Sequence, residues 1–349
     1  MRSIVQVVVA VTMIVGTGAS GRCQTTPELQ DFFQKNIGLS KEQIAAIRSG
    51  QTVAKALSSR TPREIFLVGV VYVHGSPDTY LQYSRNFDNL RKLPNYLALR
   101  VLSNPPKLSE FDGFSLDSEG IKDLKNCKPG KCEIQLPTSS IEEFQKAIHW
   151  TAPDVNEQVN RFLQKTAFER LLAYQREGNP ALGVYNDKRN PTEVLKQFVY
   201  MLSSFKAFPE QLRELYHYLL AYPDAKPTNV EDAFYWAKVK FGLKTTLRVV
   251  HIVTMHLNSA DGPTDVVAEK QLYSNHYFET ALDLTFCIPS RNDPKQPGLY
   301  LIRVMGSEQA GLTGFKGSMV RSVAVGRSVS SLRKSLTAIK NNLEQRTEH

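Results

Sequence analysis

Hydrophobic residues recur every second position in some segments of the chain and every three to four positions in others. The order of these strand-type and helix-type segments predicts an α+β fold. Alternation with many β-branched and aromatic residues predicts strands at residues 63–75, 96–103, 245–257, 265–277, 278–289 and 298–306. The last four strands follow one another through short segments of loop composition, such as "SRNDPKQP". Sequential strands with short loops favour an antiparallel sheet.

A helical period fills the middle of the chain and returns at its end. About five helices are predicted between residues 105 and 242, the last over 229–242, and Asn190 before Pro191 is a strong helix start. Near the C-terminus an apolar stripe at steps of three and four predicts a long amphipathic helix. The stripe consists of Val329, Leu332, Leu336, Ile339 and Leu343.

These patterns predict a division of the chain. Residues 51–104 and 243–349 form an α+β domain, in which an antiparallel sheet packs on the C-terminal helix. Residues 105–242 form an inserted, all-helical region, and residues 22–50 form a short helical lead. A chain of 349 residues can hold one large domain or two ordinary ones.

The first 21 residues have the three parts of a secretory signal peptide. Arg2 supplies a positive start, residues 4–15 are apolar, and "GTGASG" offers small residues at a cleavage site. We therefore expect an exported protein, periplasmic or extracellular, that is soluble after cleavage. Lipidation at Cys23 is disfavoured, because Arg22 rather than a small residue precedes it.

Export changes how the cysteines are interpreted. In an oxidising compartment, "CKPGKC" predicts a disulfide between Cys127 and Cys132, since Pro129 and Gly130 suit the two central positions of a type II turn. The alternative is half of a metal site, but Cys23 and Cys287 are distant and unpaired in the pattern. We expect no bound metal.

Composition and charge limit the classes of binding partner that we expect. Hydrophobic residues make up 42% of the chain and charged residues 22%, which is typical of a folded globular protein. The formal net charge is +9, yet the basic residues are spread along the chain with no block of five like charges. We therefore expect no nucleic-acid partner, and a membrane surface or an envelope protein stays open.

Two segments give the chain a recognisable order of elements: "VHGSPDTYLQYSRNFDNLRKLPNY" is a strand leading into helices, and "GFKGSMVRSVAVGRSVSSLRKSLTAIKNNLE" is a last helix. This order resembles the START-like superfamily, also called SRPBCC or helix-grip. The resemblance covers roughly residues 60–104 and 245–345. It implies a sheet wrapped on the last helix, around a cavity for apolar ligands such as lipids. The helical insertion departs from that family.

Candidate ligand-binding residues come from the strands and the last helix. Strand alternation places Val267, Glu269, Gln271, Tyr273, Asn275 and Tyr277 on one face of their strand, and Thr280, Leu282, Leu284, Phe286 and Ile288 on the inward face of the next. Glu279, Asp283 and Thr285 should then face solvent. A tyrosine offers apolar area with a polar tip, so Tyr273 and Tyr277 could line a ligand, although plain aromatic packing is the alternative.

Three further residues complete the candidates. His251 shares an inward face with Val249 and Val253, where it could contact a ligand or serve as a hydrogen-bonded core residue. Arg303 shares a face with Leu299 and Leu301, so it either binds an anionic headgroup or extends to the sheet edge. Leu336, in the stripe of the last helix, would roof the cavity.

No motif for a cofactor or a known catalytic centre is present. The chain lacks HxH, HExxH and GxSxG, and "GLTGFKG" lacks the spacing of a phosphate-binding loop. We expect no cofactor, and "GLTGFKG" predicts close backbone packing at a helix entry.

Three functions remain open. The first is an exported binding protein for an apolar or amphipathic small molecule, with a cavity lined mostly by apolar groups. The second is an exported hydrolase or cyclase that uses His251 or His276 as general base. The third is an envelope interaction protein without a ligand, with a solid core and an exposed apolar helical patch.

Overall fold

The computed structural model describes residues 27–93, 95–204, 212–241, 244–259, 262–290, 298–309 and 311–347. An eight-stranded antiparallel sheet forms its centre, with strand order β1-β2-β10-β9-β8-β7-β6-β3. Its strands are β1 (Val53–Leu57), β2 (Glu64–His74), β3 (Tyr96–Leu102), β6 (Val230–Phe241), β7 (Lys244–Ser259), β8 (Gly262–Ser274), β9 (Phe278–Ser290) and β10 (Gly298–Gln309).

Helices cover both faces of this sheet. They are α1 (Pro27–Asp31), α2 (Lys41–Arg48), α3 (Pro77–Arg85), α4 (Asp88–Arg91), α5 (Ser118–Lys125), α6 (Thr138–Ala147), α7 (Val155–Glu177), α8 (Val194–Leu202), α9 (Arg213–Ala221) and α10 (Gly314–Thr347). Short turns add the π-helix η1 (Phe32–Asn36) and the 3₁₀-helices η2 (Leu108–Phe111) and η3 (Asn179–Leu182). A two-stranded ribbon joins β4 (Val184–Tyr185) to β5 (Thr192–Glu193).

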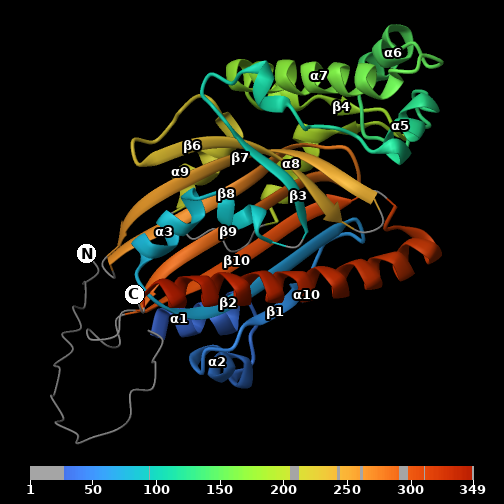
Figure 1. Ribbon diagram of the computed structural model, residues 1–349. Helices are drawn as coiled ribbons and strands as arrows, with labels where there is room; N and C mark the ends of the chain where they lie inside the picture. The colour runs from blue at the N-terminus through green and yellow to red at the C-terminus, as the bar shows by residue number, and fades with distance from the viewer. Residues whose placement is uncertain are drawn as a thin grey trace, which may run out of the picture.

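Alternation along β2 shows why the sheet is covered on both sides. Its side chains at 66, 68, 70 and 72 belong to the hydrophobic cluster that includes the helices of the middle segment. Those at 65, 67, 71 and 73 pack in a second cluster with α3 and α10. We call these sides the insertion face and the α10 face. In Figure 1, α7 lies above the sheet and α10 below it.

The C-terminal stripe packs as predicted. Leu332, Leu336, Ile339 and Leu343 are buried against β2 and its neighbours, while Val329 is partly buried. Gly69 on β2 makes this approach possible, because a Cβ there would lie 2.5 Å from Leu336 Cδ1 and 2.9 Å from Leu332 Cγ. At the entry to α10, a Cβ on Gly317 would lie 2.6 Å from the carbonyl carbon of Leu312, which agrees with the close packing predicted for "GLTGFKG".

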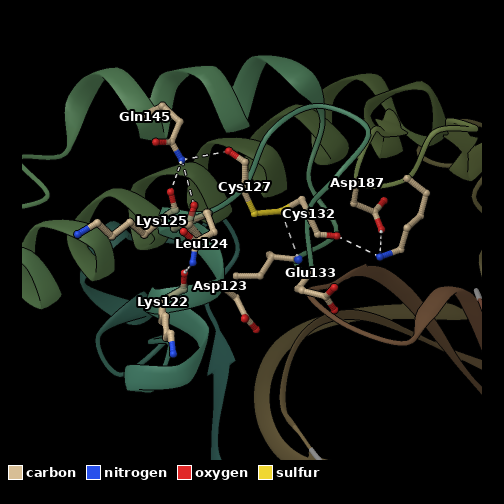
Figure 2. Close-up of a disulfide and its surroundings, with 12 residues drawn as sticks. Lys122, Asp123, Leu124, Lys125, Cys127, Cys132, Glu133, Gln145 and Asp187 are labelled. Atoms are coloured by element: carbon tan, nitrogen blue, oxygen red, sulfur yellow. Dashed lines mark hydrogen bonds and ion pairs between the residues drawn. A yellow bond between two sulfur atoms is a disulfide. The ribbon is translucent and has the colours of Figure 1, made fainter.

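A disulfide and hydrogen bonds link parts of the middle segment, residues 105–242, and its helices pack on the sheet. Cys127 and Cys132 form a disulfide, as predicted, and Gly130 between them has a φ of +78°. Figure 2 shows this loop between the helix that carries Gln145 and the chain at Asp187, whose carbonyl accepts a hydrogen bond from Cys132 N at 2.9 Å. The helices of the segment share one hydrophobic cluster with the insertion face.

One predicted element is wrong. We expected a helix over residues 229–242, whereas residues 230–241 form β6, paired with β3 and β7. Its aromatic residues hide the alternation, because both faces of the strand are buried: Phe234 and Trp236 join the insertion face, and Tyr235, Ala237 and Val239 pack on the other. The sheet therefore begins within the segment predicted to be helical, and β4 and β5 add a ribbon there. The predicted helix start at Asn190 is also wrong, because residues 192–193 pair as β5 and α8 begins only at Val194.

The face expected to meet solvent is also covered. Asp283 and Thr285 on β9 are buried, because α3 and α10 pack over the α10 face. The predicted signal peptide and Cys23 lie outside the described residues.

Candidate functional site

A buried polar network centres on His251 of β7. Its Nε2 lies 2.8 Å from Asp232 Oδ1 on β6, and its Nδ1 lies 3.1 Å from the hydroxyl of Tyr174 on α7. A carboxylate only accepts, so Nε2 donates, and Nδ1 of the neutral ring accepts from Tyr174. Asp232 also accepts from Tyr218 at 2.8 Å and pairs with Lys226 at 2.6 Å.

Burial decides the charge states in this network. It lowers the pKa of His251, and the neighbouring Asp232 only partly offsets this effect. Burial also opposes the charge of Asp232, but hydrogen bonds from His251, Lys226 and Tyr218 hold its pKa below the usual value. A neutral imidazole beside an ionised carboxylate agrees with the donor assignment above.

His251 faces inward, as the alternation predicts. Its ring stacks on Phe234 at 4.5 Å between centroids and meets the edge of Tyr222 at 4.5 Å. The residue is 0% exposed, and protein groups occupy both nitrogens. This geometry favours the hydrogen-bonded core residue over the general base, because neither nitrogen is free for a substrate.

Lys270 lies beside this network and was not among the candidates. It is the cross-strand partner of His251 and is fully buried. Its Nζ donates to the side-chain oxygen of Asn179 and, at 3.2 Å, to the carbonyl of Leu219, and lies 4.3 Å from the Phe198 ring centroid. Among the described residues no carboxylate pairs with it, and burial lowers the pKa of Lys270 to about 7.

The pH dependence of stability should report this lysine. Between pH 7 and about 10 the unfolded chain carries a proton on Lys270 that the folded chain lacks, so the free energy of unfolding should rise with pH. The rise should approach ~1.4 kcal/mol per pH unit. Lys270→Met should remove this contribution, as measured by urea unfolding at several pH values. Lys146→Met, at an exposed position of α6, should keep the wild-type slope; an equal slope in Lys270→Met would contradict the assignment.

An apolar pocket lies next to the network, between α7, η3 and the insertion face. Tyr174 belongs to both, and the apolar lining includes Leu136, Leu163, Leu171, Leu182, Val249 and Leu272. The volume is about 20 Å³, room for about one water molecule. Thr166, Arg170 and Ala181 in the lining are only half-buried, which places the mouth of the pocket among them.

Arg170 and Tyr273 supply polar groups to this pocket. The guanidinium lies beside two neighbouring rings, 5.8 Å from the centroid of Tyr185 and 5.7 Å from that of Tyr273, and donates to the carbonyl of Leu182 at 3.1 Å. In the described part of the chain, no carboxylate lies within 4.0 Å of it. The buried hydroxyl of Tyr273 finds no hydrogen-bond partner there.

Tyr273 reaches this pocket because β8 is irregular. Regular alternation put Tyr273 on the face of Glu269 and Gln271, but the register shifts between Val249 and Val250 on the paired strand. Glu269 therefore points to the α10 face, where it meets Arg303, while Tyr273 lies on the insertion face. The predicted common face of these residues is wrong, since a bulge inverts the alternation beyond it.

The second candidate base, His276, lies in a smaller polar pocket. Its Nδ1 donates to the carbonyl of Glu133 at 2.9 Å, which leaves Nε2 as the acceptor of a neutral ring. Burial, then Lys244, lowers the pKa of His276. The pocket of about 10 Å³ is also lined by Asp117, Asp123 and Lys244.

Tyr277, the next residue, occupies a turn between β8 and β9. It has a φ of +65°, its hydroxyl accepts from Lys244 N at 3.0 Å, and its ring packs on Phe241. The contacts are those of a residue that closes the end of the sheet.

Arg303 and Leu336 lie on the opposite face. Arg303 donates to Asp283 Oδ2 at 2.9 Å and to Glu269 Oε2 at 3.2 Å, so the buried guanidinium finds its partners within the sheet. Leu336 packs over Gly69, which is the cross-strand partner of Arg303. The five predicted ligand residues therefore do not converge: His251 and Tyr273 share the insertion face, Arg303 and Leu336 the α10 face, and Tyr277 one end.

Comparisons assign no family. The sequence matches no protein-family model, and no curated protein is similar enough to count as a relative. In the described ranges, no three His, Cys, Asp or Glu side chains gather as a metal site would require. None of the helices found there is both long and apolar enough to cross a bilayer.

Proposed function

We propose that this chain is an exported binding protein for a small amphipathic anion. An apolar chain would occupy the pocket between α7 and the insertion face, and its anionic end would meet Arg170. The disulfide is in keeping with an oxidising compartment. The observation that carries the proposal is Arg170 itself, a half-buried cation at the mouth of an apolar pocket, which has no carboxylate partner among the described residues.

The ligand class follows from the groups present. A carboxylate could pair with the guanidinium of Arg170 in a charge-assisted geometry and accept a hydrogen bond from the unpaired Tyr273 hydroxyl. Leucine and valine side chains suit an alkyl chain. Since the pocket now has room for about one water, a slender chain enters it only as α7 and η3 move apart. A fatty acid has this chemistry.

The helix-grip resemblance stays part of this proposal in a modified form. A long C-terminal helix across an antiparallel sheet supports it. The family pattern places a ligand under that helix, on the α10 face. Here we place the ligand on the opposite face, because Leu332, Leu336 and the Arg303 ion pairs fill the space under α10.

A displacement experiment tests the proposal. A medium-chain fatty acid and the alcohol of the same length compete with a fluorescent fatty-acid analogue for the purified protein. Arg170→Leu should weaken binding of the acid at least about tenfold, because a charged hydrogen bond contributes roughly 1.5–3 kcal/mol, and should leave the alcohol unchanged. Arg176→Leu, at an exposed end of the same helix, is the matched control.

A second variant guards against loss of folding. Thr166→Phe at the half-buried mouth should block both ligands while thermal unfolding stays near wild type. The proposal fails if the wild-type protein binds neither ligand, or if Arg170→Leu binds the acid as tightly as wild type.

Hydrolysis at His276 is a second candidate function. The supporting observation is that Nδ1 donates to the backbone carbonyl of Glu133, so that Nε2 is the unprotonated nitrogen of a ring that lines a pocket with Asp117 and Lys244. Loss of hydrolysis of a generic ester in His276→Ala, with binding at Arg170 intact, would favour this function.

A further inference from the structure

The first half of α10 exposes an apolar face. Met319, Val320 and Val323 are 64%, 55% and 54% exposed, and the first two are the most exposed large hydrophobic side chains in the described chain. Met319 and Val320 lie four and three residues before Val323, so both neighbour it on the surface of the helix. The stripe that anchors α10 to the sheet begins only later, and in Figure 1 the orange-red start of the helix extends to the right of β1 and β2.

Fixed contacts hold this face outward. Arg321 donates to the carbonyls of Pro62 and Glu64 at 3.0 and 3.1 Å and to Ser59 Oγ at 2.7 Å. Val325 packs against the cluster of the α10 face. The side of the helix that meets the protein is therefore occupied, and the side with Met319 is presented to solvent by a rigid element.

Most of the same helix, up to Glu344, carries only positive charge. From residue 314 to 343 it contains Lys316, Arg321, Arg327, Arg333, Lys334 and Lys340 but no aspartate or glutamate. Arg327 is four residues after Val323 and Lys334 is seven residues further, so both extend the exposed apolar side. Both are exposed, and neither has an ion pair among the described residues.

We propose that this face of α10, formed by Met319, Val320, Val323, Arg327 and Lys334, docks on the surface of an anionic phospholipid bilayer. The helix would lie in the plane of the membrane, with its apolar side chains among the acyl chains and its cations at the phosphates. Three large apolar side chains on one helix are too few for a stable protein interface, which buries about 800 Å² on each partner. The positive charge of Arg327 and Lys334 on this face is complementary to anionic lipid.

Vesicle sedimentation tests this surface with the full-length protein. We expect binding to phosphatidylcholine vesicles that contain phosphatidylglycerol and none to phosphatidylcholine alone. Arg327→Glu with Lys334→Glu should weaken binding by roughly thirtyfold or more, and Met319→Ser with Val323→Ser should weaken it further. The charge-matched control is Lys122→Glu with Lys146→Glu on α5 and α6, at exposed positions of the opposite side of the sheet (Figure 1).

The outcomes of these vesicle experiments either support or contradict the docking face. Since the altered side chains are exposed, thermal unfolding should match wild type, and retained binding by the control supports the docking face. Absence of binding to anionic vesicles overturns the proposal, as does an equal loss in the control, which would mean that net charge alone acts. A wild-type dimer that Met319→Ser with Val323→Ser converts to a monomer would also overturn it, because a second copy would cover the face.

Discussion

Gly178→Ala should lower the free energy of unfolding by about 3 kcal/mol or more, out of a total of about 5–15 kcal/mol. Gly178 ends α7 with φ +71° and ψ −143°, a conformation that suits glycine alone. A Cβ there would lie 1.7 Å from the carbonyl oxygen of Tyr222. That atom belongs to the backbone and cannot rotate away, so the chain must move.

The movement would reach the buried network. Tyr222 stacks on Tyr174 at 4.7 Å and packs against His251 at 4.5 Å. Gly311→Ala is the matched control, because its φ is +79° and no atom lies within 4 Å of a Cβ there. It should cost only about 1–2 kcal/mol for the left-handed backbone. Urea unfolding measures the free energy of unfolding of both variants. Equal losses would show that the contact with Tyr222 contributes nothing to the cost of Gly178→Ala.

Arg303→Met should destabilise the protein by roughly 3–5 kcal/mol, because it leaves two buried carboxylates without their cation. Asp283 and Glu269 lie 2.9 and 3.2 Å from the guanidinium, and all three side chains are at least 85% buried. If Arg303 served to bind a ligand headgroup instead, its replacement would lower the free energy of unfolding by less. Urea unfolding of the purified variant gives this free energy.

Neutral partners provide the control for this ion-pair cluster. Arg303→Met combined with Glu269→Gln and Asp283→Asn should recover most of the lost stability, since no unpaired charge then stays buried. A cost below about 1 kcal/mol for Arg303→Met alone would contradict the structural role. Failure of the triple variant to recover would assign the loss to packing of the arginine stem rather than to charge.

The site was less predictable than the elements that carry it. Alternation correctly faced His251 inward and grouped Arg303 with Leu299 and Leu301. It could not show that Lys270 opposes His251, because the register of a hairpin depends on its turn, and β7 and β8 extend to Ser259 and Gly262, past the predicted strand ends. No sequence pattern separates Arg170 from the other arginines of α7, and only packing against Tyr185 and Tyr273 distinguishes it.

The sequence by itself determined the elements whose signals are local. The Pro129–Gly130 turn joins Cys127 to Cys132, and the stripe of Leu332 and Leu336 predicts a packed helix. Each depends on neighbours within a few residues along the chain.

Tertiary structure decided what depends on partners far away in sequence. β6 is a strand because β3 and β7 bind both its edges and two clusters bury both its faces, so its pattern lacks a polar side. The bulge opposite Val249 turns Tyr273 to the insertion face. The α10 face is covered because α3 and α10 return to it from both ends of the chain. In all three cases the free energy comes from long-range burial, which a local period does not encode.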